Sequence, residues 1–262
     1  MGYRQSIRAV GLPAFSLMLL GVAFVATQIR ERPGAEGMVT PENKSIIRSW
    51  EYVDGFPEKI AVFQTVFWEP RDTNSLRELI ETTDLVRGKA VLEIGTGSGL
   101  VSLCCLRAGA ERVVATDVNQ SAIENARYNA NVLGLGERLD ARLVPIGSPS
   151  AFAALEPGET FDVIVSNPPW ENAQPRTIDE YALYDSDFQL LRSILSGARP
   201  YLKPGGRLLL AYGCRDAIQK LEQLAASHNL RVEPLDERAL QDLPEVFIPG
   251  MLLEVLPRER RF

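Results

Sequence analysis

The sequence contains few of the residues from which metal centres and disulfide frameworks are built. Its 262 residues include one histidine and three cysteines. Cys104, Cys105 and Cys214 are odd in number and lack the spacing of a zinc site, so we interpret them as core residues of a protein in a reducing compartment. His228 lies at a predicted helix end, where its side chain suits the helix dipole rather than catalysis. We therefore expect no metal site.

The sequence also has fewer basic than acidic residues. Lys and Arg number 28 against 34 Asp and Glu, which leaves a formal net charge of −6 and a sequence pI of about 5.1. Such a chain has no global positive field for phosphate backbones, and this argues against a large nucleic-acid substrate. Arg258, Arg260 and Arg261 are candidates for a local basic patch, although a solvated tail is the simpler interpretation.

The chain is organised around an apolar run that stops in three alternating glycines. Residues 91–94 read Val-Leu-Glu-Ile, and Gly95, Gly97 and Gly99 follow before an apolar-periodic segment resumes. This pattern predicts a buried strand, a tight turn and a helix over residues 98–109. Glycine lets a ligand approach the backbone closely, and a helix N-terminus presents unpaired N–H groups. The turn is therefore suited to a nucleotide-like ligand.

The same turn raises the alternative of a dinucleotide-binding fingerprint. That fingerprint needs G-x-G-x-x-G, whereas this chain has Leu100 where the third glycine belongs and reads G-x-G-x-G. Asp117 follows 22 residues after Gly95, at the end of a second apolar run over 113–116. An acidic residue at the tip of a neighbouring parallel strand can accept hydrogen bonds from both hydroxyls of a ribose. A plain strand-to-helix turn with a surface aspartate is the alternative interpretation.

A third apolar run, residues 161–166, leads directly into Asn167-Pro168-Pro169-Trp170. The prolines cannot donate to a strand ladder, so they end the strand and hold their neighbours at its carboxyl tip, where open α/β sheets bind ligands. The Asn167 side-chain oxygen and the carbonyl of Pro168 can accept both hydrogens of a planar –NH2 group, on which Trp170 can stack. An ordinary turn is the alternative, but it does not explain why three such strand ends coincide.

These motifs resemble the class I S-adenosylmethionine-dependent methyltransferases that modify planar amino groups, whose fourth strand ends in Asn/Asp-Pro-Pro-aromatic. The similarity is greatest to the small-domain protein-glutamine methyltransferases that act on peptide release factors, and to relatives that act on exocyclic amines of bases. Residues 68–76 resemble that family's proline-arginine segment beside the cofactor. The resemblance extends from about Ile60 to the C-terminus. It implies an α/β fold with a doubly wound, seven-stranded Rossmann-like sheet, mostly parallel with an antiparallel C-terminal strand.

The resemblance also implies S-adenosylmethionine as the cofactor and roles for individual residues. The expected cofactor contacts come from three strand tips: Glu93, Gly95, Thr96, Gly97, Gly99, Asp117 and Asn167. The expected substrate contacts are Asn167, Pro168, Pro169 and Trp170, of which Asn167, Pro168 and Trp170 are assigned to catalysis. For Glu93, a contact with the cofactor's amino group and a cap on nearby backbone are both open, and Arg71 pairs with a carboxylate either of the domain or of the cofactor.

Methyl transfer from a sulfonium is an in-line displacement, so the protein mainly positions the nucleophile and shields it from water. The resemblance implies an acceptor that is a protein glutamine or asparagine amide, or an exocyclic base amine of RNA or DNA. A methyltransferase of a small molecule and a non-catalytic cofactor-binding protein of the same fold are the alternatives.

The sequence departs from the family pattern in two places. Relatives place an acidic residue after the third strand to bind the adenine amine, whereas residues 145–148 of this chain read Pro-Ile-Gly-Ser. Ser148 or a backbone carbonyl is the expected substitute. The release factor enzymes have a glycine-rich stretch where residues 183–187 read Leu-Tyr-Asp-Ser-Asp, which weakens the expectation of a release factor substrate.

An uncharged stretch near the N-terminus, residues 10–29, has the length of a membrane span. Twenty helical residues cover about 30 Å, which is the hydrocarbon thickness of a bilayer. Two basic residues precede the stretch and four follow it nearby, at positions 30, 32, 44 and 48. Because the cofactor is made in the cytoplasm, we expect a single-pass anchor with the domain on the cytoplasmic face of the membrane. A cleaved signal peptide and a wrongly assigned start codon are the alternatives.

We expect three parts: an anchor or signal peptide over 1–30, a linker with a short helix (45–52) over 31–58, and a methyltransferase domain over 59–262. Within the domain we expect a strand or hairpin arm over 59–68 and a helix capped by Asp72 that ends near Thr82. A polar loop over 171–184 has the composition of a mobile substrate loop. The other expected elements alternate regularly: strand 112–117, helix 120–133 capped by Asn119, strand 138–144, helix 188–198, strand 207–213, helix 215–227, and strands 230–235 and 246–255.

Overall fold

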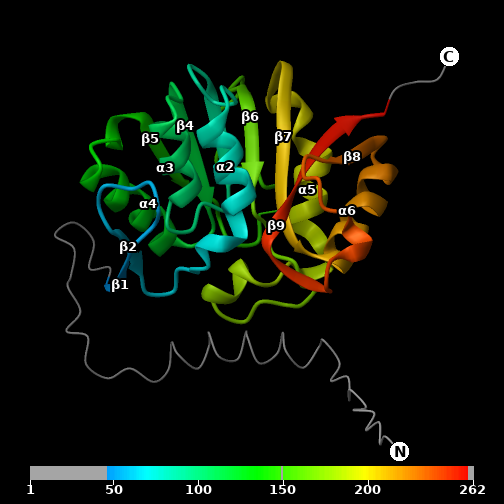
Figure 1. Ribbon diagram of the computed structural model, residues 1–262, viewed down its shortest axis with the longest axis horizontal. Helices are drawn as coiled ribbons and strands as arrows, with labels where there is room; N and C mark the ends of the chain where they lie inside the picture. The colour runs from blue at the N-terminus through cyan, green and yellow to red at the C-terminus, as the bar shows by residue number, and fades with distance from the viewer. Residues whose placement is uncertain (1–45, 149, 259–262) are drawn as a thin grey trace, which may run out of the picture. The chain divides into compact units, whose positions relative to one another are not determined.

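The structure, a computed structural model, describes residues 46–148 and 150–258. Within those residues the central element is a seven-stranded sheet in the order β5-β4-β3-β6-β7-β9-β8 (Figure 1). β9 runs antiparallel to both of its neighbours, and the other adjacent strands are parallel. The strands are β3 (Ala90–Ile94), β4 (Arg112–Asp117), β5 (Leu139–Leu143), β6 (Phe161–Ser166), β7 (Leu202–Cys214), β8 (Leu230–Pro234) and β9 (Val246–Pro257).

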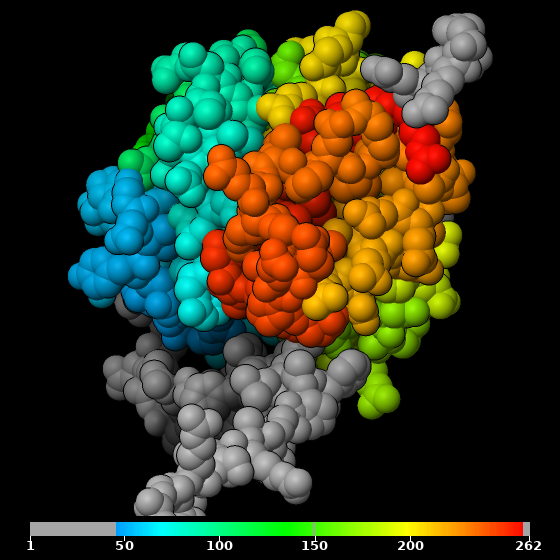
Figure 2. Space-filling model, turned by 45° about the vertical axis from the view of Figure 1, so that its right-hand side comes forward, coloured from blue at the N-terminus to red at the C-terminus, as the bar shows by residue number. Residues whose placement is uncertain are grey.

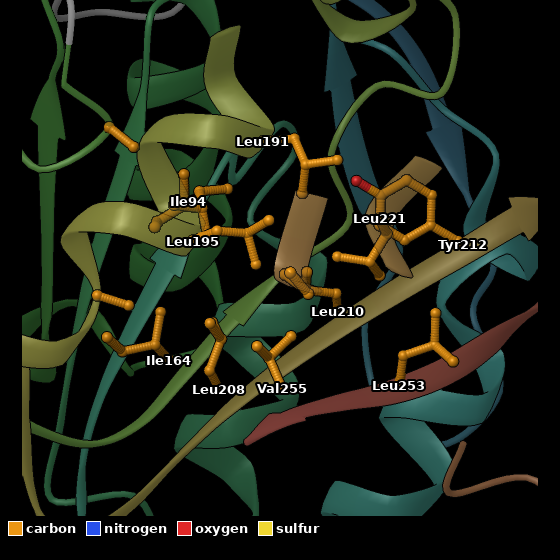
Figure 3. Packing of buried hydrophobic residues seen from close by; sticks show 14 of the residues in the cluster. Ile94, Ile164, Leu191, Leu195, Leu208, Leu210, Tyr212, Leu221, Leu253 and Val255 are labelled. Atoms are coloured by element: carbon orange, nitrogen blue, oxygen red, sulfur yellow. The ribbon is translucent and has the colours of Figure 1, made fainter. Parts of the chain in front are cut away.

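Helices cover both faces of this sheet because its strands are apolar on both sides. Side chains alternate along a strand, so odd-numbered residues such as Val91 and Val163 pack under α2 and α3, whereas Leu92 and Ile164 pack under α5 and α6 (Figure 3). The helices are α2 (Asn74–Thr82), α3 (Leu100–Arg107), α4 (Gln120–Val132), α5 (Gln189–Gly197) and α6 (Arg215–Ser227). The fold class predicted for the sheet is confirmed.

The element boundaries agree closely with the predicted ones after residue 90. The helix predicted over 120–133 is α4, and Asn119 caps it by accepting a hydrogen bond from the N–H of Ser121 at 2.9 Å. β7 is longer than the predicted strand over 207–213, because its pairing with β6 already begins at Leu202. The three cysteines are buried and free, as predicted for core residues.

The short helix predicted over 45–52 is wrong. Its described part forms β1 (Ile47–Glu51), which pairs antiparallel with β2 (Ile60–Phe63) in a separate two-stranded sheet. β2 is fully buried, and α4 holds it in place. The side-chain amide of Asn129 accepts from the N–H of Ala61 at 2.9 Å, and that of Asn125 accepts from the N–H of Phe63 at 2.8 Å. Tertiary pairing therefore overrides the local helical pattern.

Asp72 does not cap the following helix, in contrast to the prediction. Pro70 begins a short 3₁₀ turn, η1 (Pro70–Thr73), and α2 starts only at Asn74. Glu69 caps η1 by accepting from the N–H of Arg71 at 3.2 Å. The helix does end at Thr82 as predicted. Asp72 is thereby turned inward and is 5% exposed.

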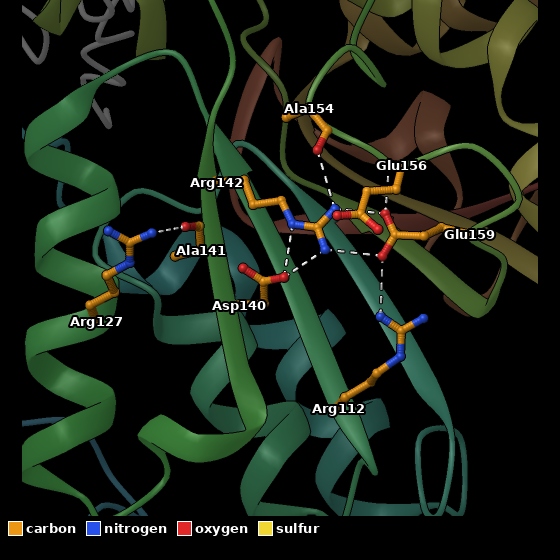
Figure 4. A network of polar contacts seen from close by, with 8 residues as sticks. All are labelled: Arg112, Arg127, Asp140, Ala141, Arg142, Ala154, Glu156 and Glu159. Atoms are coloured by element: carbon orange, nitrogen blue, oxygen red, sulfur yellow. Dashed lines mark hydrogen bonds and ion pairs between the residues drawn. The ribbon is translucent and has the colours of Figure 1, made fainter.

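A charged network holds the connection between β5 and β6 against the sheet (Figure 4). Arg142 of β5 donates from Nη1 to Oε2 of Glu159 at 2.6 Å and from Nη2 to Oε1 at 3.0 Å. Its Nη2 also donates to Asp140 at 2.6 Å, and Nη1 of Arg112 lies 3.6 Å from Glu159. Glu159, near the end of the connection between β5 and β6, is thereby attached to β5 through Arg142 and to β4 through Arg112.

The membrane location predicted from the sequence is corrected here. Throughout residues 46–148 and 150–258, no helix combines the length and the apolar character that crossing a bilayer requires. The stretch 10–29 that carried the prediction lies outside the described residues, as do the whole of 1–30 and the first part of the predicted linker.

Candidate active site

The glycine turn follows β3 directly. Gly95, Gly97 and Gly99 have φ values of +79°, +53° and +86°, a region that glycine enters without steric cost. A Cβ added to Gly95 or Gly97 would meet no atom within 4 Å, so this part of the turn is open. A Cβ added to Gly99 would lie 2.8 Å from the Cα of Ala126. Gly95 and Gly97 thus leave space beside the turn, whereas Gly99 makes room for α4.

Glu93 braces the turn from within the sheet. It is 4% exposed, and its Oε2 accepts hydrogen bonds from the hydroxyl of Thr96 at 2.8 Å and the N–H of Ser102 at 3.1 Å. The hydroxyl of Ser102 donates to the same oxygen. Burial raises the pKa of Glu93 to about 7. Of the two alternatives for Glu93, the structure shows the contact with nearby backbone, because the carboxylate accepts from the N–H of Ser102. A contact between Glu93 and a cofactor stays a prediction.

Asp117 connects the tip of β4 to the turn. Its Oδ2 accepts from the N–H of Gly97 at 2.9 Å, and its Oδ1 accepts from the N–H of Asn119 at 2.8 Å. Burial raises the pKa of this carboxyl. Each carboxylate oxygen has a second acceptor position, so Asp117 can bind hydroxyl groups beside the turn while it holds the backbone.

The three predicted strand tips form one row. Ile94 of β3 is paired with Thr116 of β4 on one side and with Ser166 of β6 on the other. The hydroxyl of Ser166 also donates to the carbonyl of Ile94 at 2.7 Å. Gly95, Asp117 and Asn167 are the residues that directly follow this row, so the register brings the motifs of the sequence to one edge of the sheet.

Asn167 carries an acceptor that lacks a partner. Its Oδ1 is buried and has no hydrogen-bond partner within the described part of the chain. Pro168 and Pro169 follow it and are both buried, and neither can supply an N–H group. More than nine in ten buried polar groups in proteins are paired, and leaving one unpaired costs about 1–3 kcal/mol. The arrangement is therefore suited to a ligand that brings an N–H donor.

Trp170 lies over a glycine of the neighbouring strand β7. A Cβ added to Gly213 would lie 2.5 Å from Cη2 of Trp170 and 2.5 Å from the backbone oxygen of Phe247. Only a residue without a side chain fits between the indole and β9. Packing on Gly213 thus fixes one edge of the indole, and its stacking on a substrate stays a prediction.

The polar loop after Trp170 is closed at its base. The N–H of Glu171 donates to the carbonyl of Leu183 at 3.4 Å, and the N–H of Asp185 donates to the carbonyl of Glu171 at 2.9 Å. The Asp185 carboxylate then accepts from the N–H groups of Leu190 and Leu191 at 2.9 and 3.0 Å, which attaches the loop to α5. The loop contains a cavity of about 360 Å³, lined by Ala173, Gln174, Arg176, Glu180 and Tyr184.

Two other predicted contacts, that of Arg71 and that of the segment after β5, are made within the protein itself. Arg71 pairs with Glu69 at 2.7 Å, so of its two alternatives it has the carboxylate of the domain. After β5, Ile146 is 59% exposed and the Ser148 hydroxyl donates to the carbonyl of Ser150 at 3.3 Å. The substitute for the acidic adenine contact stays a prediction. Among residues 46–148 and 150–258, no group of three or more His, Cys, Asp or Glu is arranged to hold a metal.

Asp72 is a residue of this edge that sequence reasoning missed. Its Oδ1 is buried without a hydrogen-bond partner in the described residues. Burial, reinforced by the charge of Glu69 and opposed by that of Arg71, raises its pKa to about 7. In the sequence Asp72 resembles a helix cap, and nothing there signals a buried carboxyl. The close packing on β7 does have a signal in the sequence. An isolated glycine inside a predicted strand, as at Gly213, indicates that another segment approaches the strand closely.

The sequence comparisons agree on one family of enzymes. Residues 64–229, more than half of the chain, match a family profile described as the methyltransferase small domain. A release factor glutamine methyltransferase of Rhodopirellula baltica is 30% identical over 178 residues, which cover 65% of this chain and 55% of that protein. A putative protein N5-glutamine methyltransferase of Methanocaldococcus jannaschii is 29% identical over 167 residues, which cover 60% of this chain and 79% of that protein. The chain spans about half the length of the release factor methyltransferases it matches.

Two solved structures share this fold. A ribosomal protein L11 methylase from Lactobacillus delbrueckii has a TM-score of 0.52 and 20% identity, and the match covers 71% of this chain and 79% of that one. Trm5b from Pyrococcus abyssi has a TM-score of 0.51 and 17% identity, with 82% and 56% covered. At these identities the likeness shows the fold alone.

Proposed function

Because this chain belongs to the methyltransferase small domain family, we propose that it transfers the methyl group of S-adenosylmethionine to the amide nitrogen of a glutamine or asparagine side chain in a protein. The relatives named as glutamine methyltransferases support this choice of acceptor. The net charge of −6 supports a protein rather than a phosphate-rich nucleic acid.

The glycine turn fits the cofactor. Gly95 and Gly97 leave open space beside the backbone, and Asp117 retains acceptor positions for the two ribose hydroxyls. Glu93 and Thr96 hold the turn in this form before any ligand arrives. The cofactor supplies an electrophilic methyl group on a sulfonium, so the protein needs neither a metal nor a covalent nucleophile for the transfer.

The single observation that carries the proposal is the unpartnered Oδ1 of Asn167. An amide nitrogen is a poor nucleophile because its lone pair is delocalised into the carbonyl group. Asn167 Oδ1 and the carbonyl of Pro168 accept its two N–H groups and orient the nitrogen toward the methyl carbon. The same contacts stabilise the positive charge that the nitrogen gains in the transition state. Trp170 covers the amide plane and excludes water.

The test measures methyl transfer by the wild type and by Asn167→Ala. The probe is the lysate of a strain that lacks the gene, incubated with tritium-labelled S-adenosylmethionine and then treated with protease or ribonuclease. We expect protease-sensitive label, and a transfer rate about 10²-fold lower for Asn167→Ala because one acceptor is lost from the transition state. Calorimetry should show nearly unchanged cofactor affinity.

A matched variant separates the acceptor role from a packing role. Asn167→Asp keeps an acceptor oxygen at the position of Oδ1, so we expect it to transfer methyl groups faster than Asn167→Ala. Label that is sensitive only to ribonuclease would reassign the acceptor to a base amine. Wild-type protein that labels neither fraction, or Asn167→Ala with wild-type activity, would contradict the proposal.

A further inference from the structure

Two strand glycines form a floor beside the proposed acceptor site. Leu209 of β7 and Leu252 of β9 pack under α2, and alternation along β9 places Gly250 on the same face of the sheet. Gly213 lies at an irregularity of the β7–β9 ladder, between Tyr212 and Cys214. β7 and β9 are adjacent, and both glycines are immediate neighbours of one paired position in their ladder. At this corner the sheet has no side chains of its own, so the segments packed above it define the surface.

Asp72 lies against one of these glycines and Trp170 against the other. A Cβ added to Gly250 would lie 2.9 Å from the backbone oxygen of Asp72, and one added to Gly213 would lie 2.5 Å from Trp170. The hydroxyl of Ser75 donates to the carbonyl of Gly250 at 2.9 Å and fixes η1 and α2 against β9. In Figure 2, the cyan residues near the start of α2 lie beside the red residues of β9.

Asn167 belongs to the same corner. Val163 and Val165 of β6 face α2, and the alternation continues to Asn167 at the tip of that strand. Ser166 is paired with Leu210, so Asn167 emerges level with the last residues of β7 that precede Gly213. Asp72 and Asn167 therefore share one face and one edge of the sheet, and Trp170, which packs against the cluster of the opposite face, reaches the same edge at Gly213.

Within residues 46–148 and 150–258, no group pairs with the Oδ1 of Asp72. Of the charged groups near it, Glu69 and Arg71 bind each other at 2.7 Å, and Arg77 of α2 donates to the carbonyl of Pro70 at 3.1 Å. β7 and β9 present Gly250 and the backbone of Tyr212, whose side chain packs on the opposite face. Asp72 is only 5% exposed as a residue and its Oδ1 is buried, so water does not solvate the carboxyl freely.

We propose that Asp72 is a further catalytic residue of the reaction proposed above, on which this inference rests: its free carboxylate oxygen shares with the carbonyl of Pro168 one of the two N–H groups of the acceptor nitrogen, and it takes that proton once the nitrogen has been methylated. The nitrogen lone pair forms the bond to the methyl carbon, the carbon–sulfur bond breaks, and its electron pair stays on sulfur as a neutral thioether. The nitrogen, now positively charged, gives one proton to Asp72, which passes it to solvent when the product leaves. A carboxyl whose pKa lies near 7 suits this step at neutral pH.

The experiment compares wild type, Asp72→Asn and Asp72→Glu between pH 5.5 and 9, with tritium transfer into the protein fraction of the gene-deleted lysate as the readout. Asp84→Asn is the control, because Asp84 is an exposed carboxylate whose side chain is 83% accessible. We expect the wild-type rate to rise through an apparent pKa near 7, and Asp72→Asn to be at least about 10²-fold slower at pH 8 without that step. Cofactor affinity, measured by calorimetry, should be unchanged.

Asp72→Glu retains a carboxyl and should keep the pH step at a reduced rate, which a purely structural role does not predict. Glu93 titrates in the same range, so the loss of the step in Asp72→Asn decides the assignment. If the wild type is active and Asp72→Asn has the same rate and pH profile, the proposed role of Asp72 is wrong. The role is also wrong if Asp72→Glu loses the pH step and the rate to the same extent as Asp72→Asn. Both outcomes leave the proposed function intact. A wild type that transfers no label overturns the proposed function, and this inference with it.

Discussion

Glu93→Gln is expected to remove a pH-dependent loss of stability from the glycine turn. In the wild type, burial raises the pKa of Glu93 from 4.5 to about 7 in the folded protein. The folded state therefore holds this proton more tightly than the unfolded state does. Its stabilising effect is fully present below pH 4.5 and is lost as the pH rises through 7. Glutamine has no proton to lose, and its amide oxygen can still accept from Thr96 and Ser102.

The size of the effect follows from the two pKa values. Each pKa unit corresponds to about 1.4 kcal/mol, so the full shift of Glu93 is equivalent to about 3 kcal/mol. Between pH 5 and pH 8, we expect the free energy of unfolding of Glu93→Gln to increase relative to that of the wild type by about 2–3 kcal/mol. Asp72 titrates with the same sign, but it is present in both proteins and cancels in the difference. The charge of Asp117 is one of the causes that raise the pKa of Glu93, so its effect is part of the measured difference.

Urea unfolding of both proteins at pH 5 and pH 8 measures this difference. A free-energy difference between variant and wild type that is the same at both pH values would show that Glu93 does not titrate in the folded protein as its burial implies. Cofactor calorimetry at pH 8 is the companion measurement. Affinity should be retained by Glu93→Gln, because the hydroxyl of Thr96 still has its acceptor in the turn.

Two further predictions separate the parts of the cofactor site. Gly99→Ala places a Cβ 2.8 Å from the Cα of Ala126 in a residue that must keep a positive φ. We therefore expect it to lower the free energy of unfolding, measured with urea, by about 2–4 kcal/mol. A stability equal to that of the wild type would contradict the packing argument. Asp117→Ala should weaken cofactor binding by about 10-fold or more, because hydrogen bonds to a charged group are lost, and unaltered calorimetric affinity would show that the ribose is held elsewhere.

The row of strand tips could be predicted from the sequence because each tip has a local signal. In the sequence, buried parallel strands are continuous apolar runs. Here each run ends at a residue that is not apolar: Gly95, Asp117 or Asn167. Parallel strands of one sheet end at the same edge. The register of the strands therefore needed no information beyond the runs themselves.

The pairing of β1 with β2 could not be predicted in the same way. β1 has five residues, too few to distinguish a strand pattern from a short helix, and its stability comes from β2. β2 is in turn held by side chains of α4, in particular Asn125 and Asn129. These contacts join segments that are more than sixty residues apart, and composition does not indicate them.

The buried position of Asp72 could not be predicted for a related reason. Aspartate directly before an apolar helical pattern is a good N-cap, and this local interpretation is sufficient for the sequence. Pro70 shifts the start of the helix to Asn74, which leaves the carboxyl inside the fold. Its neighbour Gly250 comes from the last strand of the sheet, so only the folded chain shows that the two approach.

The glycines of the two regions serve different purposes, and this bears on how the site is divided. Gly95 needs its positive φ and has empty space around it, as expected where a ligand lies against backbone. Gly213 and Gly250 lie in strands, where glycine weakens the sheet, and each is covered by a segment of this chain. The covering segments bring Asp72 and Trp170 to the edge that holds Asn167. In the proposed function, the cofactor is therefore held by a backbone turn and the acceptor by side chains that lie over strand glycines.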